Sequence, residues 1–455
     1  MPKKIENVGC PYCGVCCDDL VVTVSDDGKK ILEVENACAI GNQIFHHATG
    51  SERVTRPRLR QPDGTYKEIS YDEAIDYAAR VLYNAKKPLI YGFGSTNCEG
   101  MAAAAKVAEK AGAVLDNCAS ICHGSSFLAI FDNGYPSCTL GETKNRADVV
   151  VYWGANPAHA HPRHMSRYSI FPRGFFTGKG QKSRKIIVVD PRHTDTAQVA
   201  DIYLQVKQGH DYELFNAFRT ALRGHEIPEE VAGIKREKIL EVAEIMKKAR
   251  FGTIFYGMGL CHSDGRNHNV DIAISLTRDL NDYTKWTIMA MRGHYNIAGP
   301  GVVWSWQYGF PYCLDLTKDV AHMNPGETSS IDLAMRDEVD AFFNVATDAA
   351  AHFPIEAVKH LRKHPWITID PNICMASEIS DLHIPVGVVG VEVPGIVYRM
   401  DNVPIQYRKV IDPPEGVISD EELFERIYKR LCELEAEEAA KGKAKTTPVG
   451  VHAEE

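Results

Sequence analysis

No stretch of this sequence is apolar over the roughly 20 residues that a membrane-spanning helix needs. Long basic runs are missing as well, and the 51 lysines and arginines are outnumbered by 60 acidic residues, for a net charge of −9. A chain without basic blocks is poorly suited to the nucleic-acid backbone. We therefore expect neither a membrane span nor a nucleic-acid partner.

Signals for export are also lacking, because residues 1–5 begin no apolar segment and contain no paired arginines. The 13 cysteines are odd in number and mostly far apart. Such cysteines stay reduced inside cells, so disulfides are not expected. These features predict a cytoplasmic, anaerobic protein. Its 455 residues suffice for several domains.

One dense group of cysteines opens the chain. It has the spacing C-x2-C-x3-C, and a further cysteine follows a predicted hairpin at residues 20–34. Pairs spaced C-x2-C suit zinc or an iron–sulfur cluster, because a tight turn directs both sulfurs at one centre. The preferred ligands are Cys10, Cys13, Cys17 and Cys38. Cys16 is a spare ligand, and a structural zinc knuckle is the alternative.

Strands and helices alternate over most of the chain. We predict strands at residues 89–91, 113–115, 149–153, 185–189, 253–256, 341–345 and 366–369. We predict helices at residues 71–86, 99–111, 211–222, 235–248, 269–280 and 419–434. This alternation indicates parallel α/β sheets. Trp304 and Trp306 alternate in a run that looks like another strand.

Glycines and polar residues follow several of these strands. In open parallel sheets ligands bind at the carboxyl ends of strands, where glycine lets the backbone approach a phosphate and Asp can accept from a ribose or base. The residues concerned are Gly154, Asn156, Pro157, Asp190, Arg192, Gly257, Gly259 and Asp370. They favour a nucleotide-like ligand, although Asp-Pro after a strand is also an ordinary turn.

A second chemical motif is Cys122-His123, in a predicted turn between a strand and a helix. The start of a helix favours a thiolate, and the adjacent histidine can move protons. A buried cysteine beside an incidental histidine is the alternative. Cys118 is a rival ligand.

These motifs together resemble the molybdopterin oxidoreductase family, and in particular the B subunits of tungsten- or molybdenum-dependent formylmethanofuran dehydrogenases. The stretches most similar to those subunits are residues 10–20 and Met-Arg-Gly-His-Tyr-Asn at residues 291–296. The similarity covers nearly the whole chain, except for the charged tail.

The resemblance implies that the four cysteines hold one 4Fe–4S cluster. Cys122 would ligate tungsten or molybdenum, which is also held by two molybdopterin guanine dinucleotides; the sequence does not distinguish the two metals. His123 would relay a proton, and Arg292 would stabilise charge on CO2 or formate. Further cofactor contacts would come from Gly293, His294, Asn296 and Asp401. Structural support by His294 and a turn role for Asp401 stay open.

The implied reaction is the reversible reduction of CO2 to formate, with electrons arriving through the cluster. Formate would pass to an amidohydrolase-like partner subunit for condensation with methanofuran. This chain has no amidohydrolase signature of its own, because His159-Ala160-His161 follows a strand end instead of opening a barrel. Related formate dehydrogenases carry a lysine between the cluster and the pterin where this chain has Ile40, so a lysine or arginine elsewhere would have to take its place on the electron path.

The implied fold is α/β, with a small N-terminal iron–sulfur β-domain, interleaved doubly wound parallel α/β domains and no C-terminal β-barrel. The expected regions are 1–60 for the cluster, 61–150 with 300–380 for the domain carrying Cys122, 151–299 for the second dinucleotide-binding domain, 381–435 for a return segment and helix, and 436–455 for a charged tail.

A separate β-barrel subunit would complete pterin binding, and further iron–sulfur subunits would deliver electrons. A stand-alone formate dehydrogenase and a non-catalytic scaffold subunit are the alternatives.

Overall fold

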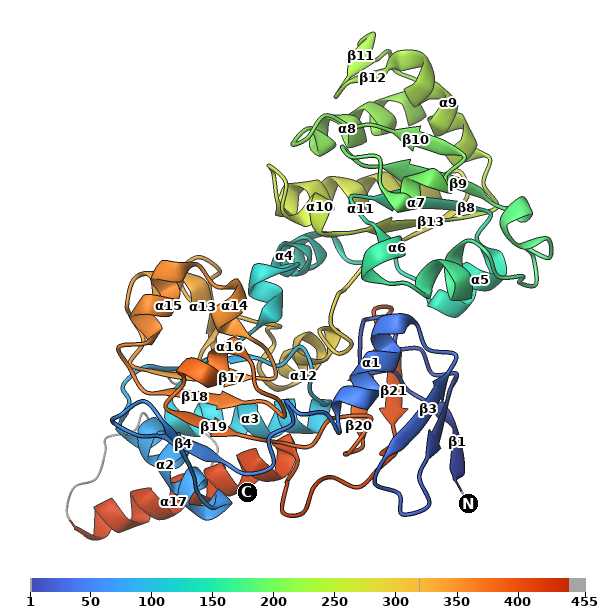
Figure 1. The fold of residues 1–455 in the computed structure, drawn as a ribbon. Coiled ribbons are helices and arrows are strands. Elements are labelled where there is room, and N and C mark those ends of the chain that lie inside the picture. Colours follow the sequence, from blue (N-terminus) through green and yellow to red (C-terminus); the bar gives the residue numbers. More distant parts are fainter. Residues whose placement is uncertain (1, 319, 442–455) are drawn as a thin grey trace, which may run out of the picture.

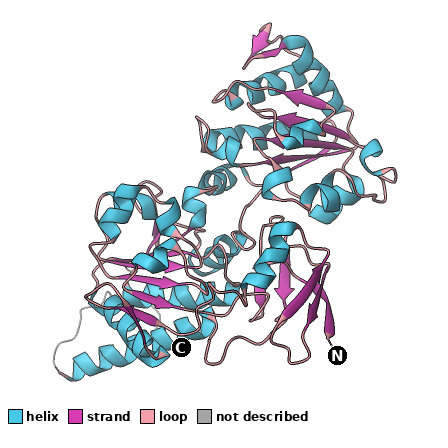
Figure 2. Ribbon diagram, in the orientation of Figure 1, coloured by secondary structure: helices cyan, strands magenta, loops and turns pink. Residues whose placement is uncertain are grey.

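Three sheets of three or more strands carry the fold in the computed structural model, which describes residues 2–318 and 320–441. They have three, five and nine strands. Figures 1 and 2 show how the strands and helices are arranged in space. Within the described residues, no helix is both long and apolar enough to cross a membrane.

The three-stranded sheet is antiparallel and lies at the N-terminus. It contains β1 (Lys3–Val8), β2 (Leu20–Val24) and β3 (Ile31–Glu35), followed by α1 (Ala39–His47). The predicted hairpin at residues 20–34 is confirmed as β2 and β3. Its turn brings the chain back so that Cys38, just before α1, returns towards the loop between β1 and β2.

The five-stranded sheet is parallel throughout. Its order is β10 (Ile202–Leu204), β9 (Lys185–Val189), β8 (Val149–Trp153), β13 (Phe251–Tyr256) and β14 (Lys285–Ala290). All five residues of β8 are buried, as expected for a parallel strand covered on both faces. The longer helices packed with this sheet are α8 (Asp211–Leu222), α9 (Arg236–Lys247) and α11 (Asn267–Asn281).

The nine-stranded sheet is mixed. Its parallel centre contains β7 (Val114–Asn117), β6 (Pro88–Gly92), β17 (Ala341–Val345), β18 (Trp366–Ile369) and β19 (Leu382–Ile384). Its antiparallel edges are β15 (Leu314–Asp315) with β16 (His322–Met323), and β4 (Arg58–Arg60) with β5 (Tyr66–Glu68). The predicted parallel arrangement thus holds at the centre of this sheet, whereas both edges are antiparallel. Adjacent strands joined by a short connection pair antiparallel, whereas parallel neighbours need a long crossover.

The nine-stranded sheet combines strands from before and after the five-stranded sheet in the sequence. β4 begins inside the region expected for the cluster, and β19 lies just past residue 380. On one side of the sheet α2 (Tyr71–Asn84), α3 (Cys98–Ala111) and α17 (Asp420–Ala440) pack together (Figure 1). The last helix extends six residues beyond its predicted end, and most of the predicted tail, residues 442–455, lies outside the described residues.

Short elements complete the chain. The helices are α4 (Gly124–Asn133), α5 (Leu140–Arg146), α6 (Pro157–Ala160), α7 (Asp195–Gln198), α10 (Met258–Cys261), α13 (Ser330–Met335), α14 (Ala349–His352), α15 (Ile355–Leu361) and α16 (Met375–Ile379). The strands are β11 (Glu230–Val231), β12 (Ile234–Lys235), β20 (Gly395–Tyr398) and β21 (Pro404–Tyr407). Single helical turns lie at Cys118–Ile121, Met165–Ser169 and Gly180–Ser183.

The strand predicted around Trp304 and Trp306 is instead the helix α12 (Ala298–Tyr308). Trp304 is fully buried, whereas Trp306 is 72% exposed. Residues two apart point about 200° apart around a helix but to the same face of a strand. The contrast in burial is thus a consequence of the helix.

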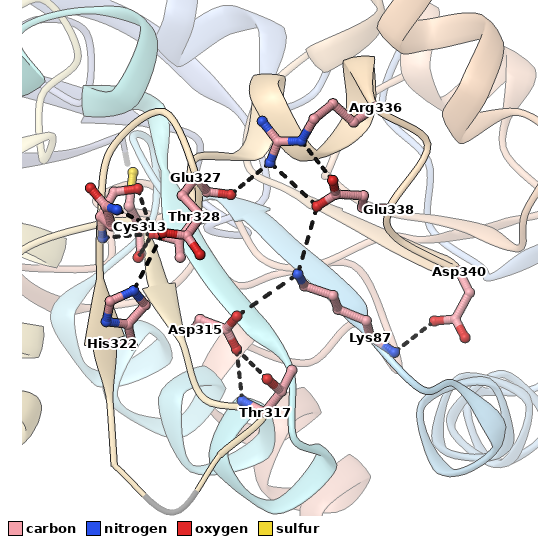
Figure 3. Close-up of polar contacts among 11 residues, drawn as sticks. Lys87, Cys313, Asp315, Thr317, His322, Glu327, Thr328, Arg336, Glu338 and Asp340 are labelled. Carbon is pink, nitrogen blue, oxygen red and sulfur yellow. Dashed lines mark hydrogen bonds and ion pairs between the residues drawn. The ribbon is translucent and has the colours of Figure 1, made fainter.

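Polar contacts hold the segment that enters β17 against the start of β6 (Figure 3). The backbone N–H of Lys87 donates to Asp340 at 2.9 Å, and its ammonium lies 3.8 Å from Asp315 and 4.0 Å from Glu338. Arg336 donates to Glu338 at 2.7 Å. Partly exposed ion pairs contribute little energy each, so their main effect is to orient this connection.

Candidate iron–sulfur and metal site

Cysteines from the loop between β1 and β2 and from the start of α1 surround one small pocket. Its sulfur-bearing residues are Cys10, Cys13, Cys16, Cys17 and Cys38. Cys38 caps α1, with its sulfur accepting from the N–H of Gly41 at 3.3 Å. A β-carbon on Gly41 would lie 3.0 Å from the Cys10 sulfur. Glycine therefore lets α1 approach the sulfurs, a role that the cysteine spacing did not reveal.

Five cysteines line this one pocket. Within residues 2–318 and 320–441, no three His, Cys, Asp or Glu side chains are grouped as ligands of a single metal ion. The Cys16 thiol donates to the carbonyl oxygen of Tyr295 at 3.0 Å, an engagement that favours the other four cysteines as ligands.

Two arginines lie beside Cys17. Arg163 donates two hydrogen bonds to Asp19, at 2.6 and 2.7 Å, and Arg167 donates to Asp18 at 2.6 Å. Burial raises the pKa of Cys17, and the two guanidinium charges oppose that rise. One terminal nitrogen of Arg167 is buried without a partner among the described residues. Positive charge therefore faces this sulfur.

Cys122 lies in the turn that joins β7 to α4. Asp116, near the end of β7, accepts hydrogen bonds from Ser120 at 2.6 Å and from the N–H groups of Cys313 and Ser330 at 3.0 and 2.9 Å. Burial, with other thiols nearby, raises the pKa of Cys122 to about 12. This burial opposes the stabilisation of the thiolate that we expect from the start of a helix, whereas a bound metal ion would deprotonate the thiol.

The rival ligand Cys118 is engaged elsewhere. Its thiol is buried and donates to the Thr347 hydroxyl at 3.4 Å. The Cys122 sulfur, in contrast, lies 3.1 Å from the sulfur of the exposed Met258. Of the two thiols, Cys122 is the one free of a strong internal acceptor.

Buried polar atoms without partners gather next to Cys122. Both ring nitrogens of His123 and the Nε of Arg292 are buried and make no hydrogen bond among the described residues. Both side chains lie against Phe127, the ring of His123 at 5.7 Å and the guanidinium at 5.8 Å. Buried polar atoms without hydrogen bonds destabilise the fold. The two side chains therefore fit a site at which a polar ligand supplies the missing hydrogen bonds. Burial and the Arg292 charge lower the pKa of His123 to about 3, which keeps the ring neutral.

The Arg292 loop contacts the cysteine loop directly. The N–H of Gly14 donates to the carbonyl oxygen of Gly293 at 2.9 Å, and a β-carbon on Gly14 would lie 2.4 Å from the Arg292 oxygen. Cys13 and His294 form an isolated β-bridge. The candidate cluster and the candidate metal site are therefore neighbours. Sequence analysis missed Gly14, since any residue can follow a cysteine in such a motif.

His161 is a second supporting residue that was not foreseen. Its ring donates to the carbonyl oxygen of Arg292 at 2.7 Å, and burial lowers its pKa to about 4. His159, the other half of that motif, is exposed and pairs with Asp195. The H-x-H spacing thus carries one structural histidine and one surface histidine.

The glycines at the strand ends pack on one another. A β-carbon on Gly154 would lie 2.8 Å from Gly259, and one on Gly257 would lie 2.5 Å from the Gly154 oxygen. The N–H of Gly259 donates to the same oxygen at 3.0 Å. Their small size is therefore required for contact between the loops after β8 and β13, apart from any ligand.

The predicted polar contacts at the strand ends also have internal partners. Asp190 accepts from the N–H of Arg192, and Asp370 from that of Asn372, each at 2.9 Å. Asn156 accepts from the Thr196 hydroxyl at 2.7 Å, next to Pro157 in the first turn of α6. Burial raises the pKa of Asp370 to about 7.

Asn296 and Asp401 hold the C-terminal return segment. The Asn296 side chain donates to the oxygen of Thr96 and accepts from the N–H of Tyr398, both at 2.7 Å. The Asp401 carboxylate accepts two hydrogen bonds from Arg399 and one from the N–H of Leu140, all at 2.7 Å. The carboxylate of Asp401 therefore joins the return segment to the start of α5. The ring of His294 packs against Gly94, a contact that is compatible with both of the roles that the sequence left open for this histidine.

Comparison with known proteins identifies the class. The family model of molybdopterin oxidoreductases matches residues 53–289. The structure of acetylene hydratase from Pelobacter acetylenicus superposes with a TM-score of 0.73 and 15% identity, over 94% of this chain and 69% of that one. This chain belongs to the molybdopterin oxidoreductase family and is an oxidoreductase.

Within that family the chain is similar to the B subunit of tungsten-containing formylmethanofuran dehydrogenase 2 from Methanocaldococcus jannaschii. The two are 48% identical over 95% of this chain and 100% of the relative, so the chain belongs with the formylmethanofuran dehydrogenase B subunits. A chain of the formyltransferase/hydrolase complex from Methylorubrum extorquens shares the fold, with a TM-score of 0.67 and 22% identity over 80% of this chain and 97% of that one.

Proposed function

We propose that this chain is the catalytic subunit of a cytoplasmic formylmethanofuran dehydrogenase complex and reversibly reduces CO2 to formate. The carrying observation is the contact between the Gly14 and Arg292 loops beside the cysteine pocket, together with the Arg292 guanidinium and the His123 ring that both lie against Phe127. The reaction is CO2 + 2 e⁻ + H⁺ ⇌ HCOO⁻. The two electrons would enter from other subunits through a 4Fe–4S cluster.

The residues present suit the implied cofactors. Cys10, Cys13, Cys17 and Cys38 would hold the cluster, and Cys122 would ligate tungsten or molybdenum carried by two molybdopterin guanine dinucleotides. That metal centre would supply two-electron redox chemistry. A soft thiolate suits such a metal.

Arg292 and His123 would handle the substrate. The buried guanidinium of Arg292, held by Asn402 on one nitrogen, keeps other N–H groups to bind formate or the developing charge on bent CO2. The neutral ring of His123 can donate or accept a hydrogen bond there and pass on the proton that accompanies the electrons. Their burial excludes water, which strengthens both interactions.

The other subunits would complete the pathway. The shared fold with a chain of a formyltransferase/hydrolase complex supports assembly with partners. We propose an amidohydrolase-like subunit that condenses formate with methanofuran, a β-barrel subunit that completes pterin binding, and iron–sulfur subunits that deliver electrons. Gly154, Asn156, Pro157, Asp190, Arg192, Gly257, Gly259 and Asp370 would line the dinucleotides through their loops.

The test is Cys122→Ala in the anaerobically purified complex, with Cys118→Ala as the matched control in the same turn. We expect Cys122→Ala to abolish CO2/formate turnover and lower the tungsten or molybdenum content, with the 4Fe–4S electron paramagnetic resonance (EPR) signal intact. Cys118→Ala should keep all three. Turnover retained in Cys122→Ala would remove Cys122 as the ligand. Zinc without tungsten or molybdenum in the native complex would favour a scaffold role.

A further inference from the structure

An aromatic loop projects from the domain of the five-stranded sheet. Phe171, Phe175 and Phe176 are 42%, 90% and 59% exposed. Single exposed apolar residues are common, but several within one short loop mark a contact surface. We call residues 171–176 the aromatic loop.

The backbone of the aromatic loop is held rigidly. The buried guanidinium of Arg184 donates to the oxygens of Ile170, Pro172 and Lys144 at 3.1, 2.8 and 2.7 Å. The N–H groups of Phe175 and Phe176 donate to the side chain and backbone of Asn145 at 3.2 and 2.9 Å. The exposed rings therefore belong to a loop with a fixed backbone, and aromatic side chains have only two side-chain torsions to lose when a partner covers them.

A basic pocket adjoins the aromatic loop. It has a volume of about 450 Å³ and is lined by Arg146, Arg250, Lys285, Phe176 and Phe251 among others. It lies where β13 and β14 begin, whereas the candidate metal site lies beyond their carboxyl ends. The pocket is thus separate from the proposed chemistry.

Two of the three cationic side chains in the pocket lack an ion-pair partner within the described residues. The guanidinium of Arg146 lies 5.7 Å from the ring of Phe176, and neither Arg146 nor Lys285 forms an ion pair within the described part of the chain. Arg250 pairs with Asp148 at 3.1 Å. Glu142 also lines the pocket, and its carboxylate accepts from the N–H of Thr139 at 3.3 Å. Three cationic side chains and one carboxylate in the lining leave the pocket basic.

We propose that the aromatic loop and this pocket form a docking surface for another protein subunit, which places an acidic side chain in the pocket and apolar side chains over Phe175 and Phe176. The inference rests on the proposed function only in requiring a multi-subunit complex. A second copy of this chain is disfavoured, because a two-fold contact would bring the basic pocket against itself.

Zero-length cross-linking of the purified complex tests the chemistry. A carbodiimide joins an amine to a carboxylate in direct contact, so Lys285 should form an amide with an Asp or Glu of a different subunit. Lys285→Arg keeps the charge but has no reactive amine, and should lose that cross-link. Absence of any Lys285 cross-link to another subunit, or a cross-link to a second copy of this chain, would overturn the proposal.

Variants test the contribution of the loop to binding. The double variant Phe175→Ser/Phe176→Ser should weaken binding of the subunit that the Lys285 cross-link identifies. We expect its affinity for the complex, measured by native mass spectrometry without cross-linker, to fall about tenfold or more. Arg146→Glu should do the same. Leu240→Ser is the matched control, a 41% exposed residue on α9 of the same domain, and should have no effect.

Unchanged subunit composition in both loop and charge variants would refute the docking surface. Should the double variant fail to fold, judged by its thermal midpoint and iron content, Arg146→Glu and the Lys285 cross-link decide alone. Metal content and turnover report separately on the proposed function, so the two ideas can fail independently.

Discussion

His161 and Arg292 are 131 residues apart in sequence, yet the His161 ring donates a hydrogen bond to the Arg292 carbonyl oxygen at 2.7 Å. Because burial lowers the pKa of His161 to about 4, the ring is neutral and keeps a single N–H for this bond. The same loop is held from the other side by Gly14. The position of Arg292 thus depends on residues outside its own motif.

Asn402 positions the Arg292 side chain by accepting from one of its terminal nitrogens at 2.8 Å. Its φ is +59°, so Asn402→Gly removes the acceptor without backbone strain. We expect turnover to fall about tenfold with unchanged metal content, consistent with loss of one charge-assisted hydrogen bond. Arg292→Lys should lose more, because a point charge does not replace a planar fork.

Steady-state kinetics with formate, beside thermal midpoints, measures both variants. If Arg292→Lys lowers the free energy of unfolding by as much as it raises the activation free energy of turnover, Arg292 is a structural residue.

Arg167 should tune the cluster that we propose. Reduction adds negative charge, which a nearby guanidinium stabilises, and hydrogen bonds to the sulfurs also affect the potential. Arg167→Gln should therefore lower the reduction potential of the 4Fe–4S centre. Asp18→Asn, which frees Arg167 from its 2.6 Å partner, should raise it. EPR-monitored redox titration checks the two signs, and shifts in the same direction would contradict this account.

Arg53 and Glu392 form a buried ion pair that ties the start of the chain to the return segment. Two hydrogen bonds, at 3.1 and 2.7 Å, join side chains that are 4% and 1% exposed. Glu392→Ala leaves the guanidinium without its partner and should lower the free energy of unfolding by about 3–5 kcal/mol. The control Glu378→Ala breaks a pair whose carboxylate is 54% exposed and should lower it by less than about 1 kcal/mol. Similar losses in a denaturant titration would mean that burial of the pair is unimportant.

His383 should make stability depend on pH. Its ring accepts a hydrogen bond from the Arg58 guanidinium at 3.0 Å and donates one to the backbone carbonyl oxygen of Asp370 at 2.8 Å. Burial lowers the pKa of His383 to about 4. An unfolded histidine has a pKa of about 6.5, so between about pH 6.5 and 4 the unfolded chain binds a proton that the folded chain does not. Stability from this residue is complete above about pH 6.5 and falls by about 3 kcal/mol as the pH drops towards 4.

The measurement is the thermal midpoint of wild type and His383→Gln at neutral pH and at about pH 5, inside that window. Glutamine keeps an acceptor and a donor but does not titrate, so the variant should lose less stability on acidification. An identical pH dependence would show that His383 does not carry this effect.

Local patterns in the sequence determined much of the fold. The helices at residues 71–86 and 211–222 and the strands at residues 149–153 and 185–189 all form where their periodicity and caps predict, because those signals depend on neighbouring residues. The cysteine spacing and the similarity at residues 291–296 indicated the family, because these motifs too consist of residues close together in the sequence. These features needed no knowledge of distant contacts.

Tertiary structure decided the rest. Trp304 and Trp306 are two apart, a spacing that a strand and a helix both allow, and only packing against α3 selects the helix. The mixed order of the nine-stranded sheet, the hydrogen bond from His161 and the contact of Gly14 with the Arg292 loop join residues more than 100 positions apart. No local pattern encodes such pairs, because they exist only once burial has brought separate segments together.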